Sequence, residues 1–365
     1  MKILRLVFAV LVAIIVVSCT PQQPPKSAVV LAYVTSWSSV MPDPTYLTHI
    51  NYAFGHVNET FNGVMINRTS RNDNSGRPTS EDRLRSIVAL KKQKPSLKVM
   101  LSIGGWGSGR FSEMAADEAN RLAFAADCQR VVKEFNLDGI DMDWEYPTSS
   151  AAGISSSPAD MDNFTLLMRD IRQAIGKDKL LTFASASNAR YVDFKAIDQY
   201  VDFVNIMTYD MGNPPYHHSA FKPSEFTRIS CIESVERHVA AGIAIHKLTL
   251  GIPFYGHGTD SVPRSVDYRN IINISGILGF VDLRNRRIVS LTGYEAKWDD
   301  EAQVPYWVDS AGKFVFTYET AQSIAIKCEW LKQKGMLGAM YWEYNGDDDA
   351  GTLSKAVYHG VMGNP

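Results

Sequence analysis

The sequence lacks a basic patch, an internal repeat and a low-complexity tract, and these absences exclude several classes of protein. Its formal net charge is -2 over 365 residues, whereas binding to nucleic acid or to an anionic membrane surface requires clustered lysine and arginine. Without a repeat or a visible second domain, the chain is expected to fold as one unit. It does have apolar content, 45% hydrophobic and 11% aromatic residues, which is enough for a large core.

Long apolar runs are rare, and the exception lies at the start of the chain. Residues 1–18 join a basic start, with Lys2 and Arg5, to an apolar run that is short for a transmembrane helix and typical of a signal peptide. Residues 16–19, VVSC, resemble the bacterial lipobox, in which the signal is cut before a cysteine that receives lipid. We therefore expect a lipidated Cys19 and a Pro-rich tether over residues 19–28. An ordinary signal peptide with an incidental cysteine is the alternative.

This interpretation also predicts a location. The protein would be secreted and held to a bacterial membrane, on its periplasmic or cell-surface side, only through the lipid anchor. Cys128, Cys231 and Cys328 would then remain. An odd number cannot be fully paired within the chain, so we expect no disulfide framework. Cys128 and Cys328 lie in segments of helical periodicity, where small buried hydrophobic residues are typical.

Eight apolar runs alternate with helical patterns in the rest of the chain. Continuous apolar character predicts strands buried on both faces, as in a parallel sheet covered by helices. The expected strands are residues 29–34, 49–54, 98–105, 137–144, 180–187, 201–209, 247–255 and 335–344, and helical periodicity is clear in 81–94, 119–135, 161–176 and 323–335. Eight βα units predict an α/β fold, the TIM (β/α)8 barrel.

The interval before the last expected strand is too long for one helix and two loops. Roughly eighty residues separate the seventh strand from the eighth. Residues 258–316 are rich in aromatic side chains between turn-like stretches. We therefore predict a small α+β insertion subdomain at 258–316, with residues 29–257 and 317–365 forming the barrel.

The stretch LDGIDMDWEYP, residues 137–147, places four carboxylates in an otherwise apolar strand: Asp138, Asp141, Asp143 and Glu145. Because strand side chains alternate between faces, the last three share one face. In a barrel that face points inward, and Glu145 lies at the carboxyl end, where barrel enzymes hold catalytic residues. Stacked carboxylates cannot all be ionised cheaply in a dry interior, so at least one is expected to hold a proton near neutral pH, as a general acid must.

Two other interpretations of these carboxylates stay open. A solvated charged edge is one, although the intervening residues are large and apolar. A Mg²⁺ or Ca²⁺ site is the other, since clustered carboxylate oxygens suit these ions. No histidine or second acidic run adjoins the cluster, and Asp347, Asp348 and Asp349 form a run typical of a solvated turn. We therefore expect no metal and no cofactor.

The acidic stretch resembles the D-x-x-D-x-D-x-E motif of the family 18 glycoside hydrolases. The resemblance extends over nearly the whole chain after the leader, because LAYVTSW, INYAF, SIGGW, MTYD, GIPFYG and GAMYWEY follow in order on the expected strands. WDDEAQVPYW in the insertion resembles the α+β subdomain of that family's chitinases. The resemblance implies retaining hydrolysis of β-1,4-linked N-acetylglucosamine, in chitin or its oligomers. The substrate's own 2-acetamido carbonyl would be the nucleophile and would form an oxazolinium ion.

The same resemblance implies catalytic roles for named residues. Glu145 would protonate the leaving glycosidic oxygen and later activate water. Asp143 would hydrogen-bond the acetamido N–H, and Asp141 would share a proton with Asp143. Tyr209 would orient the acetamido carbonyl. Asp138, the first acid of the motif, would support the others.

Further positions are implied to bind substrate or to hold the acids. Trp342 would form the floor under the reacting sugar, since a flat apolar ring fits the C–H face of a pyranose. The other candidates are Met207, Asp210, Tyr33, Trp106 and Tyr255 for substrate binding, with Tyr33 and Ser102 also hydrogen-bonded to Asp141. Ordinary packing is the alternative for these positions.

One position departs from the family pattern. His257 follows GIPFYG, where the family often has arginine, so a sugar-binding arginine is absent and the preferred substrate length stays open. The remaining histidines, with His217 and His218 among them, show no ligand spacing and are expected to be structural or on the surface.

Three functions are compatible with the sequence. The first is a chitinase-type hydrolase, and the second is an endo-β-N-acetylglucosaminidase acting on the chitobiose core of N-glycans, which uses the same motif. The third is a sugar-binding lectin of the same fold, although lectins of this family usually lack the acid that corresponds to Glu145. We expect a monomer whose partner is chitin or another N-acetylglucosamine-containing saccharide.

Overall fold

The computed structural model describes residues 28–66, 79–259, 262, 264–274, 277–282, 287–290 and 293–363, with only the backbone described for 272–290. Cys19, the predicted signal peptide and most of the predicted tether lie outside these ranges. Across these ranges, none of the helices combines the length and the apolar character that a membrane crossing requires.

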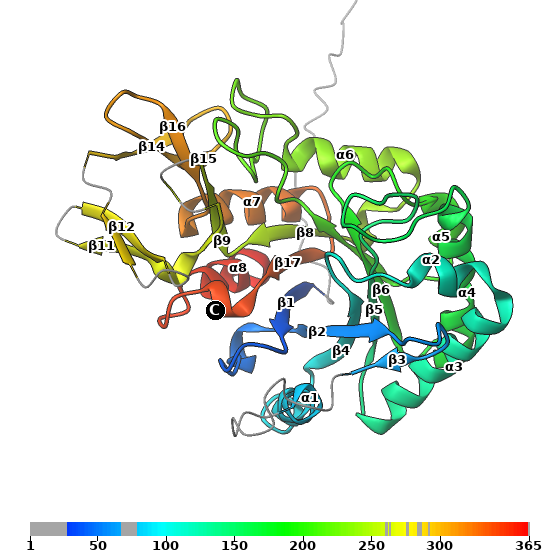
Figure 1. Ribbon diagram of the computed structural model, residues 1–365. Coiled ribbons are helices and arrows are strands. Elements are labelled where there is room, and N and C mark those ends of the chain that lie inside the picture. Colours follow the sequence, from blue (N-terminus) through cyan, green and yellow to red (C-terminus); the bar gives the residue numbers. More distant parts are fainter. Residues whose placement is uncertain are drawn as a thin grey trace, which may run out of the picture.

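Eight parallel strands close into a barrel (Figure 1). Their order is β1-β17-β8-β7-β6-β5-β4-β2, and β1 also pairs with β2 to close the ring. The strands are β1 (Val29–Thr35), β2 (His49–Val57), β4 (Lys98–Gly104), β5 (Gly139–Asp143), β6 (Leu180–Ala186), β7 (Phe203–Met207), β8 (Leu248–Pro253) and β17 (Gly338–Trp342). Each falls on one of the eight apolar runs, so the predicted TIM barrel is confirmed. The short β3 (Val64–Met65) adds to β2 in the antiparallel direction.

Helices cover the outside of the barrel. They are α1 (Ser80–Ala89), α2 (Phe111–Ala116), α3 (Glu118–Glu134), α4 (Asp160–Ile175), α5 (Phe194–Ile197), α6 (Cys231–Ala241), α7 (Ala321–Gln333) and α8 (Thr352–Met362), with the 3-10 helices η2 (Leu90–Lys92), η3 (Ile245–Lys247) and η5 (Tyr344–Gly346). Cys128 on α3 and Cys328 on α7 are buried and, like Cys231, free. The expectation of no disulfide therefore holds within the described residues.

The first βα unit differs from the predicted pattern. β1 reaches β2 through the 3-10 helix η1 (Pro44–Tyr46) and not through an α-helix. Pro42 and Pro44 lie in this connection, and a proline disfavours helical geometry in the residue before it. The Asp43 carboxylate accepts from the backbone N–H of Thr45, which caps the single turn.

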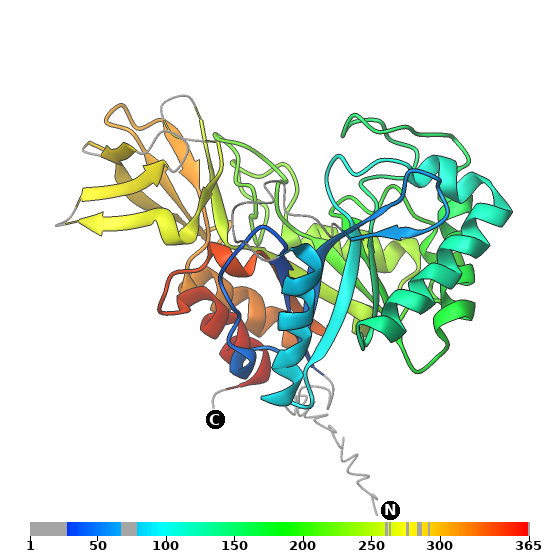
Figure 2. The same ribbon diagram turned by 60° about the horizontal axis from the view of Figure 1, so that its bottom comes forward.

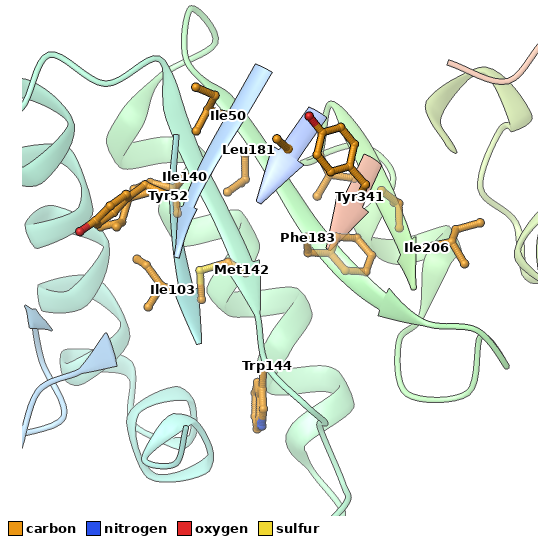
Figure 3. Close-up of a cluster of buried hydrophobic side chains, with 14 of the residues drawn as sticks. Ile50, Tyr52, Ile103, Ile140, Met142, Trp144, Leu181, Phe183, Ile206 and Tyr341 are labelled. Atoms are coloured by element: carbon orange, nitrogen blue, oxygen red, sulfur yellow. The ribbon is translucent and has the colours of Figure 1, made fainter. Parts of the chain in front are cut away.

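Side chains of the barrel strands alternate between the outside of the barrel, where helices cover them, and its interior. On β5, Ile140 and Met142 belong to the large cluster between barrel and helices, which Figure 3 shows together with Trp144 just beyond the strand. Asp141 and Asp143 alternate with them and are also buried. The period of two residues therefore places the acids inside the barrel, as the sequence pattern predicted.

A lobe of short strands lies between β8 and α7 and stands beside the barrel (Figures 1 and 2). It contains β9 (Tyr255–Gly258), β10 (Val266–Asp267), η4 (Tyr268–Asn270), β11 (Ile271–Ile274), β12 (Ile277–Asp282), β13 (Arg287–Ser290), β14 (Glu295–Asp299), β15 (Val304–Val308) and β16 (Phe314–Thr317). The strands form two sheets, ordered β10-β9-β16-β15-β14 and β11-β12-β13. The prediction of an α+β insertion differs from this finding, because the described residues of the lobe form strands and one 3-10 helix. Strands this short leave little periodicity in a sequence.

The fully buried Lys327 of α7 forms hydrogen bonds with the segment that follows β7. Lys327 Nζ donates to the backbone oxygen of Ser219 at 2.7 Å and to its Oγ at 2.8 Å. The same ammonium forms an ion pair with the carboxylate of Glu319, and both side chains are shielded from water. A buried pair of this kind is costly to break from one side, because the remaining charge is left without a partner.

We predict that Lys327→Met lowers the free energy of unfolding by about 3–5 kcal/mol, since Glu319 is left buried and unpaired. Urea unfolding followed by circular dichroism measures this loss. The double variant Lys327→Met, Glu319→Gln removes both charges and should recover part of the stability. A single variant as stable as the parent would show that the pair contributes nothing.

Candidate active site

A cleft of about 880 Å³ opens at the carboxyl ends of the barrel strands. It gathers most of the site residues predicted from the sequence: Tyr33, Trp106, Asp143, Glu145, Met207, Tyr209, Asp210, Tyr255 and Trp342. They come from six different strand ends or the segments that follow them. The barrel thus brings together residues that are far apart in the chain, at the end where barrel enzymes hold their chemistry.

Asp141 lies beneath this cleft and is saturated with hydrogen bonds. Its carboxylate accepts from four neutral donors of four strands: Tyr33 Oη at 2.9 Å, Ser102 Oγ at 2.8 Å, Thr182 Oγ1 at 2.5 Å and Asn205 Nδ2 at 3.1 Å. Complete burial raises the pKa of Asp141 above its ordinary value, although these hydrogen bonds act to lower it. Tyr33 and Ser102 thus contact Asp141 as the family resemblance implies.

Asp143 is the least satisfied of the acids. Its side chain is buried, and Oδ1 has no hydrogen-bond partner among the described residues. Burial raises the pKa of Asp143 well above its ordinary value, and the charges of Glu145 and Asp141 raise it further. The raised pKa favours the protonated form of this carboxyl, which keeps hydrogen-bonding capacity for a ligand.

Glu145 stands two residues beyond the end of β5, at the wall of the cleft. Burial raises the pKa of its carboxyl to about 7; a hydrogen bond with Tyr146 acts against this shift, and the charge of Asp210 adds to it. A carboxylic acid whose pKa lies near neutrality exchanges its proton in either direction at little cost. Glu145 therefore has the properties of a general acid and base.

Aromatic rings form the floor and the rim of the cleft. The ring of Trp342 stacks on Phe54 at 5.6 Å between centroids and 18° between planes, and it lies 5.6 Å from the ring of Tyr33. Trp37 and Trp106 are 65% and 64% exposed at the cleft. Exposed indoles in a cleft offer flat apolar surfaces to a ligand, and sugar rings present a matching C–H face.

Tyr209 and Met207 line the cleft near the acids. Tyr209 follows β7 and is buried, and its hydroxyl lies 3.9 Å from the sulfur of Met340. Burial raises the pKa of Tyr209 well above its ordinary value, followed by the charges of Asp143, Asp210 and Glu145. The phenol therefore stays protonated and can act as a hydrogen-bond donor.

Asp210 joins the cleft to β9 of the lobe. Its Oδ1 accepts from the hydroxyl of Tyr255 at 2.7 Å and lies 2.7 Å from Nε2 of His257. Burial acts to raise the pKa of Asp210, but His218 and His257 outweigh it and hold this pKa below its ordinary value. Asp210 is therefore an anion at neutral pH, unlike the buried acids on β5.

The described residues contain one group of histidine and carboxylate side chains close enough to hold a metal ion: Asp210, His218 and His257. Sequence reasoning missed this group and assigned no ligand arrangement to any histidine. The loop after β7 and β9 of the lobe bring His218 and His257 together in space. Spacing along the chain does not show such a contact. His217 has the contacts of a structural residue, because its buried Nε2 pairs with Asp299 of β14 in the lobe.

Asp138 is the motif residue that lies far from the cleft. It precedes β5 and so lies at the opposite end of that strand from Asp143. Its Oδ2 accepts from Lys91 Nζ at 2.8 Å and from the backbone N–H of Val99 at 2.9 Å. Asp138 therefore fixes the base of the barrel and supports the other acids only through the position of β5.

Other residues that had no role in the sequence analysis also belong to the site. Thr182 and Asn205 complete the hydrogen bonds of Asp141, and Trp37 adds an exposed ring at the cleft. The first two are polar residues inside apolar strand runs, and Trp37 follows the first expected strand. The polar interruptions were therefore a usable signal, but the sequence does not show that they meet at one carboxylate.

The fold and the site together define a class of enzyme. A TIM barrel that carries a carboxylic acid of near-neutral pKa above a tryptophan floor, in an aromatic cleft, has the construction of a glycosidase. The chain belongs to the glycosyl hydrolases family 18, whose sequence profile matches residues 29–347.

Individual relatives and solved structures agree with this assignment. Chitinase A1 of Niallia circulans is 32% identical, and the match covers 87% of this chain and 55% of the chitinase. An endochitinase of Manduca sexta is 27% identical, and the match covers 92% of this chain and 67% of the endochitinase. Among solved structures, a family 18 N-acetylglucosaminidase from Paenibacillus barengoltzii is 33% identical with a TM-score of 0.73, covering 91% of this chain and 99% of the other. Chitinase ChiA74 of Bacillus thuringiensis is 26% identical with a TM-score of 0.77, and the match covers 93% of this chain and 70% of the other. The chain thus spans little more than half the length of the Niallia relative.

The pKa of Glu145 predicts an alkaline limb in the activity profile. The acid form is needed for proton donation and is lost as the pH rises through about 7. We therefore expect kcat/KM to fall about tenfold per pH unit above that value, and a glycoside with a good leaving group to flatten this limb. Initial rates across a pH series on both substrates test this. A limb centred at the ordinary glutamate pKa would contradict the assignment.

Proposed function

We propose that the protein is a retaining glycosidase that cleaves β-1,4-linked N-acetylglucosamine in chitin or its oligomers, with the substrate's own 2-acetamido carbonyl as the nucleophile. The observation that carries this proposal is Asp143: a buried carboxyl with a raised pKa and an unpartnered oxygen, next to saturated Asp141 and to Glu145 at the cleft wall. Such a group can accept a hydrogen bond from an amide N–H.

In the first step Glu145 donates its proton to the leaving glycosidic oxygen. The acetamido carbonyl oxygen attacks the anomeric carbon and forms the oxazolinium ion, while the bond to the leaving sugar breaks. Asp143 accepts a hydrogen bond from the acetamido N–H and stabilises the positive charge that develops there. In the second step Glu145, now a carboxylate, takes a proton from water. The water oxygen attacks the anomeric carbon while the bond from that carbon to the acetamido oxygen breaks, which regenerates the acetamido group and gives net retention of configuration.

Neighbouring residues position the reacting sugar in this scheme. Tyr209 donates its hydroxyl hydrogen to the acetamido carbonyl, and the protonated state favoured by its burial supports this role. Trp342 supports the apolar face of the sugar, and Met207 and Asp210 line the same subsite. Asp141 holds the proton that Asp143 releases when it turns toward the substrate, since both carboxyls have raised pKa values.

The names of relatives support the substrate class without fixing the substrate. Several are chitinases, and one structure is that of an N-acetylglucosaminidase. The test is to incubate the purified protein with chitin oligomers of two to six sugars and with a high-mannose glycopeptide, and to read the products by mass spectrometry. Shortened oligomers support the proposal. Release of the glycan with one N-acetylglucosamine left on the peptide would favour the endo-β-N-acetylglucosaminidase, and binding without cleavage would favour the lectin.

The division of work between Glu145 and Asp143 can be measured. Glu145→Gln keeps the shape and removes the transferable proton, so kcat should fall by about 10²-fold to 10⁴-fold while oligomer binding persists. A good leaving group should restore part of the first-step loss in Glu145→Gln and less of it in Asp143→Asn, where acetamido attack is still impaired. A thiazoline mimic of the oxazoline should bind Asp143→Asn more weakly than the parent.

The control for these variants is Asp162→Asn, which removes an exposed carboxylate of α4 away from the cleft. Its rates on both substrates should match those of the parent. Near-normal turnover by Glu145→Gln on natural oligomers would contradict the proposal. Equal cleavage of substrates that lack the 2-acetamido group would contradict it too.

We also propose that Cys19 carries a lipid that holds the enzyme at a bacterial membrane. The support for this is the sequence alone: a basic start, a short apolar run and VVSC at residues 16–19. Cys19→Ala should leave the precursor unlabelled by a fatty-acid analogue, whereas Cys128→Ala, a substitution at a buried cysteine, should label normally. Undiminished labelling of Cys19→Ala would remove the lipoprotein assignment.

A further inference from the structure

A histidine without a hydrogen-bond partner is buried beside the cleft. The side chain of His218 is 0% exposed, and neither Nδ1 nor Nε2 has a partner among the described residues. A neutral imidazole carries one donor and one lone pair, and leaving both unsatisfied in the interior is unfavourable. Its Nδ1 lies 3.9 Å from Oδ1 of Asp210, and its ring centroid lies 4.7 Å from that of His257. His218 therefore faces a carboxylate and a second imidazole, and its nearest approach to the carboxylate, 3.9 Å, is longer than a hydrogen bond.

His257 lies against the same carboxylate. Its Nδ1 lies 2.8 Å from Oδ1 of Asn213, and its Nε2 lies 2.7 Å from Oδ1 of Asp210. A metal ion bound to Nε2 and to the Asp210 carboxylate would also give a nitrogen of His218 the partner that it lacks.

We propose that Asp210, His218 and His257 form a binding site for a divalent transition-metal ion of the Zn²⁺ type. One ligand atom from each lies within 4.8 Å of the others. Two imidazoles and a carboxylate are a ligand set that suits Zn²⁺ and does not suit Mg²⁺ or Ca²⁺. Tetrahedral bonds of 2.0–2.2 Å separate ligand atoms by about 3.4 Å, and side-chain shifts of roughly 1 Å bring the three atoms to that spacing.

The surroundings of these ligands resemble those of metal sites in general. Ligating histidines usually donate their second ring N–H to an oxygen, and Asn213 supplies that oxygen to His257. Ligating carboxylates are themselves hydrogen-bonded, and Tyr255 donates to Asp210 at 2.7 Å. Asp210 is exposed to the cleft while His218 is buried, so the ion is held from the protein side and its remaining coordination position faces the cleft.

The site has a consequence for the enzyme that rests on the proposed function. Because Asp210 lines the cleft, a bound ion and an oligosaccharide compete for the same carboxylate. Zn²⁺ therefore acts as an inhibitor that raises KM and leaves kcat unchanged. Proton transfer by Glu145 and Asp143 does not use the ion, so the protein freed of metal by a chelator is the active form.

Calorimetry on the purified, chelator-treated protein tests the site without any assay of activity. Titration with Zn²⁺ should show one saturable site per chain, and Mg²⁺ should show none. His257→Gln keeps a donor toward Asp210 but removes the ligand nitrogen, and should weaken Zn²⁺ binding at least about tenfold. Asn213→Ala should weaken it about tenfold through the orientation of His257. His246→Gln, which removes an exposed histidine of η3, is the matched control and should leave the affinity unchanged.

Anomalous scattering at the zinc edge from a crystal grown with Zn²⁺ locates the ion. A peak between Asp210, His218 and His257 supports the proposal. Absence of saturable binding, unchanged affinity in His257→Gln, or a peak elsewhere overturns it. Failure of the proposed function is distinguishable, since the protein would then bind Zn²⁺ but hydrolyse no N-acetylglucosamine substrate at any metal concentration. Zn²⁺ binding at this site with no effect on KM would overturn the competition with substrate.

Discussion

Burial of carboxylates inside a closed barrel is the constraint on which the rest of this structure depends. Asp141 and Asp143 are 0% and 4% exposed, and an ionised carboxylate at such a position is costly unless charges or hydrogen bonds compensate it. The protein compensates Asp141 with neutral donors from β1, β4, β6 and β7. Since these donors come from both sides of β5, the acid is satisfied only when the barrel has closed around it.

Hydrogen bonds compensate Asp143 and Glu145 less fully than Asp141. This difference suits them to ligand binding and proton transfer. Asp141 uses both oxygens within the protein, whereas Oδ1 of Asp143 has no partner among the described residues. The pKa of Glu145 is raised to about 7, mainly by burial, so it exchanges a proton near neutrality. The three acids therefore differ with their depth at the end of β5. Asp141 is saturated with hydrogen bonds, Asp143 has an unpartnered oxygen, and Glu145 titrates near neutral pH.

The sequence predicted those features that depend on local periodicity. The eight strands and the inward side of β5 follow from apolar runs and from alternation of period two, and the acids of the cleft follow from the motif on that strand. It could not predict contacts between segments that are distant in the chain. Asp138 belongs to the motif but lies at the base of the barrel, Thr182 and Asn205 meet Asp141 through strand register, and His218 meets His257 through the lobe. The lobe was predicted to be α+β, whereas its described residues form strands and one 3-10 helix. Short strands that pair with distant neighbours leave little periodicity in the local sequence.

The lobe also connects a departure from the family pattern, His257, to the acids of the cleft. β9 follows β8 directly, and its His257 pairs in register with Thr317 of β16. Gly256 lets the two strands approach, since a Cβ there would meet the ring of Phe316 at 2.4 Å. The sheet of the lobe therefore fixes Tyr255 and His257 against Asp210, and the charge of Asp210 in turn raises the pKa of Glu145. A change at residue 257 thus alters the charge that Glu145 experiences while the hydrogen bonds that bury Asp141 stay intact.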